Sequence, residues 1–306
     1  MSDGTGRSPV QELADLNWGE RQEFLGVPSV DFARAAVVIL PVPYEATASY
    51  MPGAGDGPRA IIEASQYLEL YDHELDSEPI DIGIHTLAPL ILPKDSPELA
   101  LGELRQVLDT LVEQGKFVLM LGGEHSITAE AVLAHVNRRG DRAIAVLQLD
   151  AHADLREEYE GTSLSHACVM HRIHDSVSLV QVGIRSLTKP ERELMASRDI
   201  RVTFSHEMNK DGWAQRCLDA LGEDVYITID VDFFDPSLVP STGTPEPDGA
   251  VWKPSIDLLG AVFREKRVLG ADIVELAPIS GLVAPDFLVA KLAYKLVGFV
   301  ASQGMS

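Results

Sequence analysis

Residues 143–154 read AIAVLQLDAHAD, a passage from an apolar run to three metal-capable side chains at every second position. The apolar part, 143–149, predicts a strand that is buried on both faces of a sheet. A strand sends alternate side chains to the same side. If that alternation continues, Asp150, His152 and Asp154 point into one pocket and suit a hard divalent cation. Burying them together without a cation would be costly.

Similar apolar runs recur along the chain and alternate with helix-like stretches. Strands are predicted at 35–41, 117–121, 143–149, 178–182, 200–204, 225–229 and 268–273, and helices at 98–114, 128–138, 189–196, 212–221, 255–266 and 285–302. This alternation indicates an α/β fold of three layers, a central and mainly parallel sheet with helices on both faces. Without an internal repeat or linker, we expect a single domain over residues 1–306. Residues 1–30 would form an N-terminal arm with a short helix near 10–16.

Composition excludes several classes of protein. The 306 residues carry a formal net charge of −22, whereas nucleic-acid binding demands basic patches. Such a surface could attract a cationic substrate or serve solubility alone. The two cysteines, Cys168 and Cys217, provide no disulfide framework or CxxC site. Neither a secretory signal nor a long apolar run is evident, so we expect a cytoplasmic enzyme with no membrane partner.

Ionisable residues follow four of the predicted strands. His125 comes after 117–121, Asp150 after 143–149, Asp230 and Asp232 after 225–229, and Glu275 after 268–273. Ligands of open parallel sheets bind beyond the carboxyl ends of the strands. We therefore expect these side chains to meet in one site.

The number of potential metal ligands favours two cations. They are His125, Asp150, His152, Asp154, Asp230 and Asp232. One octahedral ion could not use all six and stay open to substrate, but two ions that share bridging aspartates could. Mostly oxygen ligands with one imidazole per ion favour manganese over zinc or copper.

Three separated motifs resemble the ureohydrolase family, which includes arginase, agmatinase, guanidinobutyrase and formimidoylglutamase. They are LGGEHSIT at 121–128, VLQLDAHAD at 146–154 and TIDVD at 228–232, the last continued by Pro236, Pro240, Ser241 and Gly249. The resemblance extends from about Pro43 to the C-terminus. Its motifs are specific for the family and much less specific for the substrate.

The resemblance implies a single α/β domain with two Mn²⁺ ions per chain. By resemblance, one ion is held by His125, Asp150, Asp154 and Asp230, and the other by His152, Asp150, Asp230 and Asp232. Asp150 and Asp230 would bridge them. The family's reaction is attack of the bridging hydroxide on a guanidinium carbon, which releases urea and an amine. Family members commonly form trimers or hexamers, so we expect a homo-oligomer.

Two further residues match catalytic positions of the family. Glu275 matches the acid that holds the guanidinium flat by paired hydrogen bonds. His166 matches a flexible histidine that carries a proton to the departing amine. Here the sequence departs from the family's usual Ser-His-Gly-Thr, because Ala167 and Cys168 follow the histidine. We expect Cys168 to be a packed thiol rather than a nucleophile.

The substrate is predicted from the loops. Residues 182–188 lack the acids that help arginase to hold an α-amino group. The loop 155–161, LREEYEG, resembles the agmatinase branch, and Glu157 and Ser163 are candidate substrate-binding residues. Residues 44–53 resemble the family's N-terminal substrate loop. The resulting expectation is hydrolysis of agmatine, which is cationic at both ends, to putrescine and urea.

Two alternatives stay open. Guanidinobutyrase activity would need a cation for the substrate carboxylate, and Arg156 is a candidate. A zinc-dependent, deacetylase-like amide hydrolase shares a similar sheet by analogy only. Such a site typically holds one zinc ion, so metal stoichiometry discriminates between the two classes. A non-catalytic homologue is disfavoured because no ligand is missing.

Overall fold

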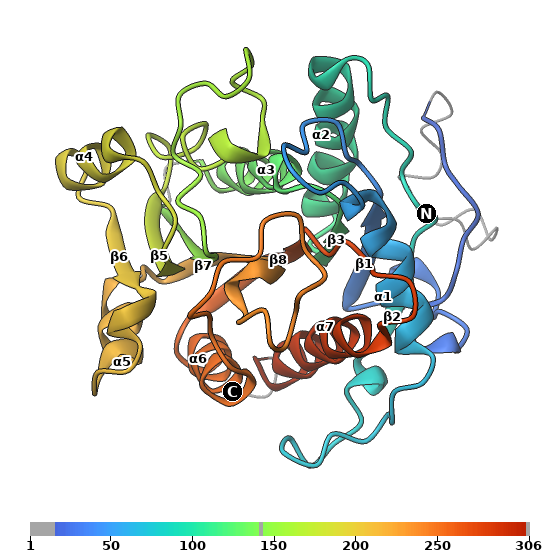
Figure 1. Cartoon of the computed structure of the whole chain (residues 1–306). Helices are drawn as coiled ribbons and strands as arrows, with labels where there is room; N and C mark the ends of the chain where they lie inside the picture. The colour runs from blue at the N-terminus through green and yellow to red at the C-terminus, as the bar shows by residue number, and fades with distance from the viewer. Residues whose placement is uncertain (1–15, 141–142, 304–306) are drawn as a thin grey trace.

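The computed structural model describes residues 16–140 and 143–303, so most of the helix expected near residues 10–16 lies outside the described part. Eight parallel strands form one sheet in the order β2-β1-β3-β8-β7-β4-β5-β6 (Figure 1). The strands are β1 (Val37–Val42), β2 (Ile84–Thr86), β3 (Phe117–Gly122), β4 (Ile144–Leu149), β5 (Ser178–Ile184), β6 (Arg201–Phe204), β7 (Asp224–Asp230) and β8 (Arg267–Val274). All residues of β1, β3, β4 and β7 are buried, as their apolar runs require.

Helices cover both faces of the sheet and complete the three predicted layers. One apolar core joins the sheet to α1 (Gly57–Ser65), α5 (Trp213–Ala220), α6 (Trp252–Glu265) and α7 (Val283–Gln303). The other core joins the opposite face to α2 (Pro97–Glu113), α3 (Thr128–Arg139) and α4 (Lys189–Ser197) (Figure 1). Alternate residues of β1 divide between the two cores, Val37 and Ile39 into one, Val38 and Leu40 into the other.

The predicted strands and helices are confirmed, with ends that shift by a few residues. The sequence prediction lacked β2 and α1. The strand β2 has only three residues, two of them His85 and Thr86, so it gives no apolar run. The helix α1 starts with Gly57 and Pro58, which usually mark a turn. Pro58 is tolerated here because the first helical residues donate no intrahelical hydrogen bond.

No helix within residues 16–140 and 143–303 is both long and apolar enough to span a membrane. The longest, α7, packs its apolar side chains into the core. Figure 1 shows this helix below the sheet.

Candidate metal centre

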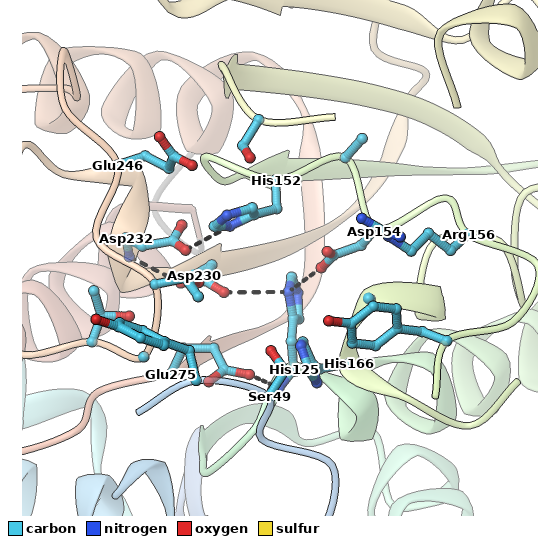
Figure 2. Close-up of a pocket in the computed structure, with 18 of the residues that line it drawn as sticks. Ser49, His125, His152, Asp154, Arg156, His166, Asp230, Asp232, Glu246 and Glu275 are labelled. Carbon is cyan, nitrogen blue, oxygen red and sulfur yellow. Dashed lines mark hydrogen bonds and ion pairs between the residues drawn. The ribbon is translucent and has the colours of Figure 1, made fainter. Parts of the chain in front are cut away.

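The predicted ligands converge at the carboxyl ends of the four central strands. His125 follows β3, Asp150 follows β4, Asp230 ends β7, and Glu275 follows β8. These four strands are neighbours in the sheet, in the order β3-β8-β7-β4. Figure 2 shows that the labelled side chains face a common cavity.

One imidazole nitrogen lies among three carboxylates. His125 Nδ1 is 3.0 Å from Asp154 Oδ2, 3.2 Å from Asp150 Oδ2 and 3.6 Å from Asp230 Oδ2. It is buried and makes no regular hydrogen bond. A nitrogen aimed at three acidic oxygens, without a hydrogen-bond partner of its own, is the environment of a metal ligand.

A second group of candidate metal ligands shares Asp150 with the first group. His152 Nδ1 lies 2.8 Å from Asp232 Oδ2 and 3.8 Å from Asp150 Oδ1. The ligand atoms of His125, Asp150 and Asp230 lie within 4.8 Å of one another, as do those of Asp150, His152 and Asp232. Asp150 offers oxygens to both groups, so the residues present fit two cations that share it.

The buried carboxylates repel one another. Burial, reinforced by Asp154 and Asp232, raises the pKa of Asp150 to about 7. Burial also raises the pKa of Asp230 well above its ordinary value, with Asp232 and Asp150 adding to the effect. Bound cations would relieve this repulsion, because they favour the ionised carboxylates.

Polar residues inside the strands orient the ligands. His125 Nε2 lies 2.8 Å from Thr228 Oγ1, and the Thr228 hydroxyl donates to Asp272 Oδ1 at 2.6 Å. This fixes the ring with Nδ1 toward the carboxylates. On the other side, Gln148 Nε2 donates to Asp150 Oδ2 at 2.7 Å. The sequence analysis missed Thr228, Asp272 and Gln148, although a polar residue within an apolar strand was a visible signal.

Strand alternation explains the site only in part. The strand β4 ends at Leu149, and Asp154 has a φ of 53°. Its side chain reaches His125 because the chain turns, and not because an extended strand continues. Glu275 is also left-handed, with a φ of 65°. Such conformations cost about 1–3 kcal/mol in non-glycine residues and cluster at functional sites.

Glu275 lines the cavity and contacts the backbone of the candidate ligand His125. Its Oε1 accepts a hydrogen bond from the backbone N–H of His125 at 2.6 Å, and its own N–H donates to Gly123 O at 2.8 Å. Burial, reinforced by Glu124, raises the pKa of Glu275 to about 8. A cationic group in the cavity would favour the ionised form of this carboxyl.

His166 is held by the loop that follows β1. Its Nδ1 lies 3.0 Å from Thr47 Oγ1, and its backbone N–H donates to the same oxygen at 3.1 Å. Thr47 is fixed in turn by Glu124, whose Oε2 accepts from Thr47 N at 2.7 Å and whose Oε1 accepts from Thr47 Oγ1 at 3.1 Å. The sequence analysis predicted His166 but not Thr47 or Glu124, whose contacts join distant segments.

The cavity has a volume of about 320 Å³ and contains most of the predicted residues. His166 and Glu275 line it together with His125, His152, Asp154, Asp230 and Asp232. Glu157 and Ser163 are exposed and are not among its lining residues, so their role in substrate binding stays a prediction. Cys168 is buried, and burial raises its pKa to about 11, as for a packed thiol.

Two acids of the cavity wall were not predicted, Glu191 and Glu246. Glu191 forms the capping box of α4 with Thr188. The pattern Thr-x-x-Glu before a helix was a signal for this structural role. Glu246 lies in the loop after β7, where a single glutamate carries no distinguishing pattern.

Known proteins are similar to this chain in sequence and in fold. The chain is 40% identical to an N(1)-aminopropylagmatine ureohydrolase of Synechocystis sp., with 92% of this chain and 94% of that protein covered. It is 33% identical to an agmatinase of Pyrococcus horikoshii, with 90% and 95% covered. The agmatine ureohydrolase structure from Thermoplasma volcanium superposes with a TM-score of 0.81 at 29% identity, covering 89% of this chain and 92% of that one. The sequence model of the arginase family matches residues 35–298, and the chain therefore belongs to the arginase family of ureohydrolases.

Proposed function

We propose that this protein hydrolyses agmatine to putrescine and urea, with two manganese ions in the centre built on Asp150. The observation that carries the proposal is a single cavity. Its wall contains residues of both groups of candidate metal ligands, together with the Glu275 carboxylate and His166. Relatives named agmatinase and aminopropylagmatine ureohydrolase support a guanidine with a cationic tail.

We assign His125, Asp150, Asp154 and Asp230 to one ion and His152, Asp150, Asp230 and Asp232 to the other. Carboxylates with one imidazole each suit manganese. When bound, such a pair of ions lowers the pKa of a shared water and supplies hydroxide near neutral pH.

The chain itself would bind the guanidinium and move the proton. Glu275 Oε1 is occupied by the His125 N–H, which orients the carboxylate, and charge-assisted hydrogen bonds would hold the planar cation against it. His166 would protonate the departing amine. Thr47 at its Nδ1 leaves the other ring nitrogen available for that transfer.

The decisive assay measures urea from agmatine, arginine, guanidinobutyrate and formimidoylglutamate with manganese-loaded enzyme. We expect agmatine to give the highest kcat/KM of the four. Urea from arginine with none from agmatine would contradict the proposal. A preference for guanidinobutyrate would instead favour guanidinobutyrase, with Arg156 in the cavity wall as the contact for its carboxylate.

A second candidate substrate is aminopropylagmatine, which is agmatine extended by an aminopropyl group. The 40% identical Synechocystis relative has this name. Three exposed glutamates, Glu157, Glu158 and Glu160, flank Tyr159 of the cavity wall and could meet the additional amine. We expect a direct comparison of kcat/KM for the two substrates to decide between them. If aminopropylagmatine is preferred, substitution of these glutamates should reduce that preference.

We also propose a homo-oligomer of three or six chains. Large apolar side chains are exposed on the described surface, including Tyr67 at 79%, Val283 at 73% and Phe287 at 43%. Light scattering should give a mass of three or six times the 33.3 kDa of one chain. A mass of one chain would exclude the oligomer.

A further inference from the structure

Most acids that line the cavity already have partners. Glu191 Oε1 accepts from Leu155 N at 3.0 Å, and its Oε2 accepts from Thr188 N at 2.6 Å and Thr188 Oγ1 at 2.7 Å. Glu275 accepts from His125 N, and the aspartates form the metal centre. Among the described residues of the wall, only the Glu246 carboxylate has neither a hydrogen bond nor an ion pair. This carboxylate is therefore available to bind a group of the substrate.

The backbone of Glu246 is fixed relative to the metal centre. Arg185 Nη2 donates both to Glu246 O at 2.9 Å and to Asp232 O at 2.6 Å, so one guanidinium joins this loop to a ligand segment. Earlier in the loop, Thr242 bridges to Leu276, the residue after Glu275. Glu246 is thus tied to the segments that carry Asp232 and Glu275. The fold therefore fixes the position of this loop relative to the candidate metal centre and to the guanidinium-binding carboxylate proposed above.

The two sides of the cavity carry opposite charges. Figure 2 shows Glu246 and Arg156 on opposite sides of the ligand cluster. The Arg156 guanidinium lies 4.8 Å from the centre of the Tyr159 ring, which holds it against the other wall. A substrate ammonium would be repelled by Arg156 and attracted by Glu246.

We propose that Glu246 binds the nitrogen at the far end of the substrate's four-carbon chain while Glu275 binds the guanidinium. This inference rests on the proposed agmatine-type function and names the residue that selects a cationic tail. The same nitrogen occurs as a secondary amine in aminopropylagmatine, so Glu246 would recognise the feature that both candidate substrates share. It would disfavour guanidinobutyrate, whose carboxylate would meet the carboxylate of Glu246.

The test compares agmatine with N-butylguanidine, which has the same four-carbon chain and a hydrogen atom in place of the ammonium. In manganese-loaded Glu246→Gln we expect the ratio of kcat/KM for agmatine to that for butylguanidine to fall about 10- to 100-fold, the loss of one charge-assisted contact. Where butylguanidine turns over too slowly, its inhibition constant against agmatine replaces kcat/KM. Glu246→Asp should retain part of the ratio, and Glu246→Lys should shift preference toward guanidinobutyrate.

The matched control is Glu113→Gln, which removes an exposed glutamate at the end of α2, outside the cavity lining. It should change the ratio by less than about twofold, since exposed charges contribute little. An unchanged ratio in Glu246→Gln, with agmatine still hydrolysed by the wild type, would overturn the inference and leave the proposed function intact. Wild-type enzyme that hydrolyses guanidinobutyrate but not agmatine would overturn the proposed function itself. Equal manganese content in all variants excludes damage to the metal centre.

Discussion

Asp230 is a residue whose proposed role as a metal ligand has a cost in stability. Its carboxyl is buried beside Asp232 and Asp150, which raises its pKa well above the ordinary range. A buried carboxylate without a cation is costly, whereas binding of a cation to the native state stabilises it. The buried carboxylates therefore carry a free-energy cost that metal binding at the proposed centre would offset.

Substitution of Asp230 by asparagine should separate these two effects. Without metal, we expect Asp230→Asn to have a melting temperature at least equal to that of the wild type, because one repulsive charge is gone. Manganese at about 100 times the dissociation constant should stabilise the wild type by about 2.7 kcal/mol for each ion bound and the variant far less. Calorimetry with and without manganese, together with metal analysis, measures both. Asp219→Asn, an exposed substitution on α5, is the control. Full activity in metal-free Asp230→Asn would refute the assigned centre.

Thr47 is a positioning residue, because it contacts His166 and Glu124 rather than the reacting atoms. Thr47→Val keeps the shape but removes the three hydroxyl contacts with His166 and Glu124, so we expect kcat to fall about tenfold, part of the 10²–10⁴ that general acid catalysis provides. Thr47→Ser should retain most activity. In a His166→Ala background, Thr47→Val should have little further effect, as residues that act through one another are not additive. Independent effects of the two substitutions would contradict this role.

At the scale of secondary structure, the end of β3 must pack closely against the chain that follows β1. Gly123 N donates to Val42 O and Glu124 N donates to Tyr44 O, both at 2.9 Å. A Cβ added to Gly123 would lie 1.9 Å from Tyr44 O, a clash with backbone that no rotamer change can relieve. The glycine therefore permits the approach that brings His125 and the loop of Thr47 together.

Gly123→Ala should destabilise the protein by about 1–3 kcal/mol or more, as overpacking of a tight contact does. Gly102→Ala on the exposed face of α2 is the matched control, since nothing lies within 4 Å of its added Cβ. That substitution should stabilise the helix by about 0.5–1 kcal/mol. Urea unfolding of both variants tests the contrast. Equal changes in the free energy of unfolding would show that the backbone at the end of β3 can shift to accommodate the added Cβ.

The sequence predicted the elements and ligands whose signals are local. Runs such as 117–121 identify buried strands, and the acids that follow them identify the edge of the sheet. Thr47, Glu124 and Glu246 could not be assigned in this way, because their roles depend on contacts with residues far along the chain. The backbone conformation of Asp154 could not be predicted from the sequence either, since its left-handed φ depends on the turn around it.

At the scale of the whole molecule, stability against acid depends on buried groups outside the site. His135 belongs to α3 and is buried against the sheet, with the centre of its ring 5.6 Å from that of the Tyr226 ring. Burial, helped by Arg139, lowers its pKa from 6.5 to about 4. The unfolded chain therefore takes up a proton at a higher pH than the folded protein does. The stability associated with His135 is present above pH 6.5 and is lost as the pH falls toward 4.

This loss amounts to roughly 3 kcal/mol across that interval. In His135→Gln, we expect the free energy of unfolding to depend less steeply on pH between 6.5 and 4. His73→Gln, at an exposed histidine, should leave the slope unchanged. Denaturation at a series of pH values measures all three slopes. A wild-type slope in His135→Gln would show that other groups cause the acid sensitivity.

The strand β8 has a consequence for the synthesis of this protein. It lies between β3 and β7, so it joins β2-β1-β3 to β7-β4-β5-β6, yet it is the last strand to leave the ribosome. His125 belongs to the first half, whereas Asp150, His152 and Asp232 belong to the second. In a nascent chain that ends before residue 267, we expect Asp150, His152 and Asp232 to come together. His125 cannot reach Asp150 and Asp230 in such a chain, because β8 is missing between the two halves of the sheet. We expect the complete centre to form only after translation has passed β8, so that truncated chains gain no activity from metal.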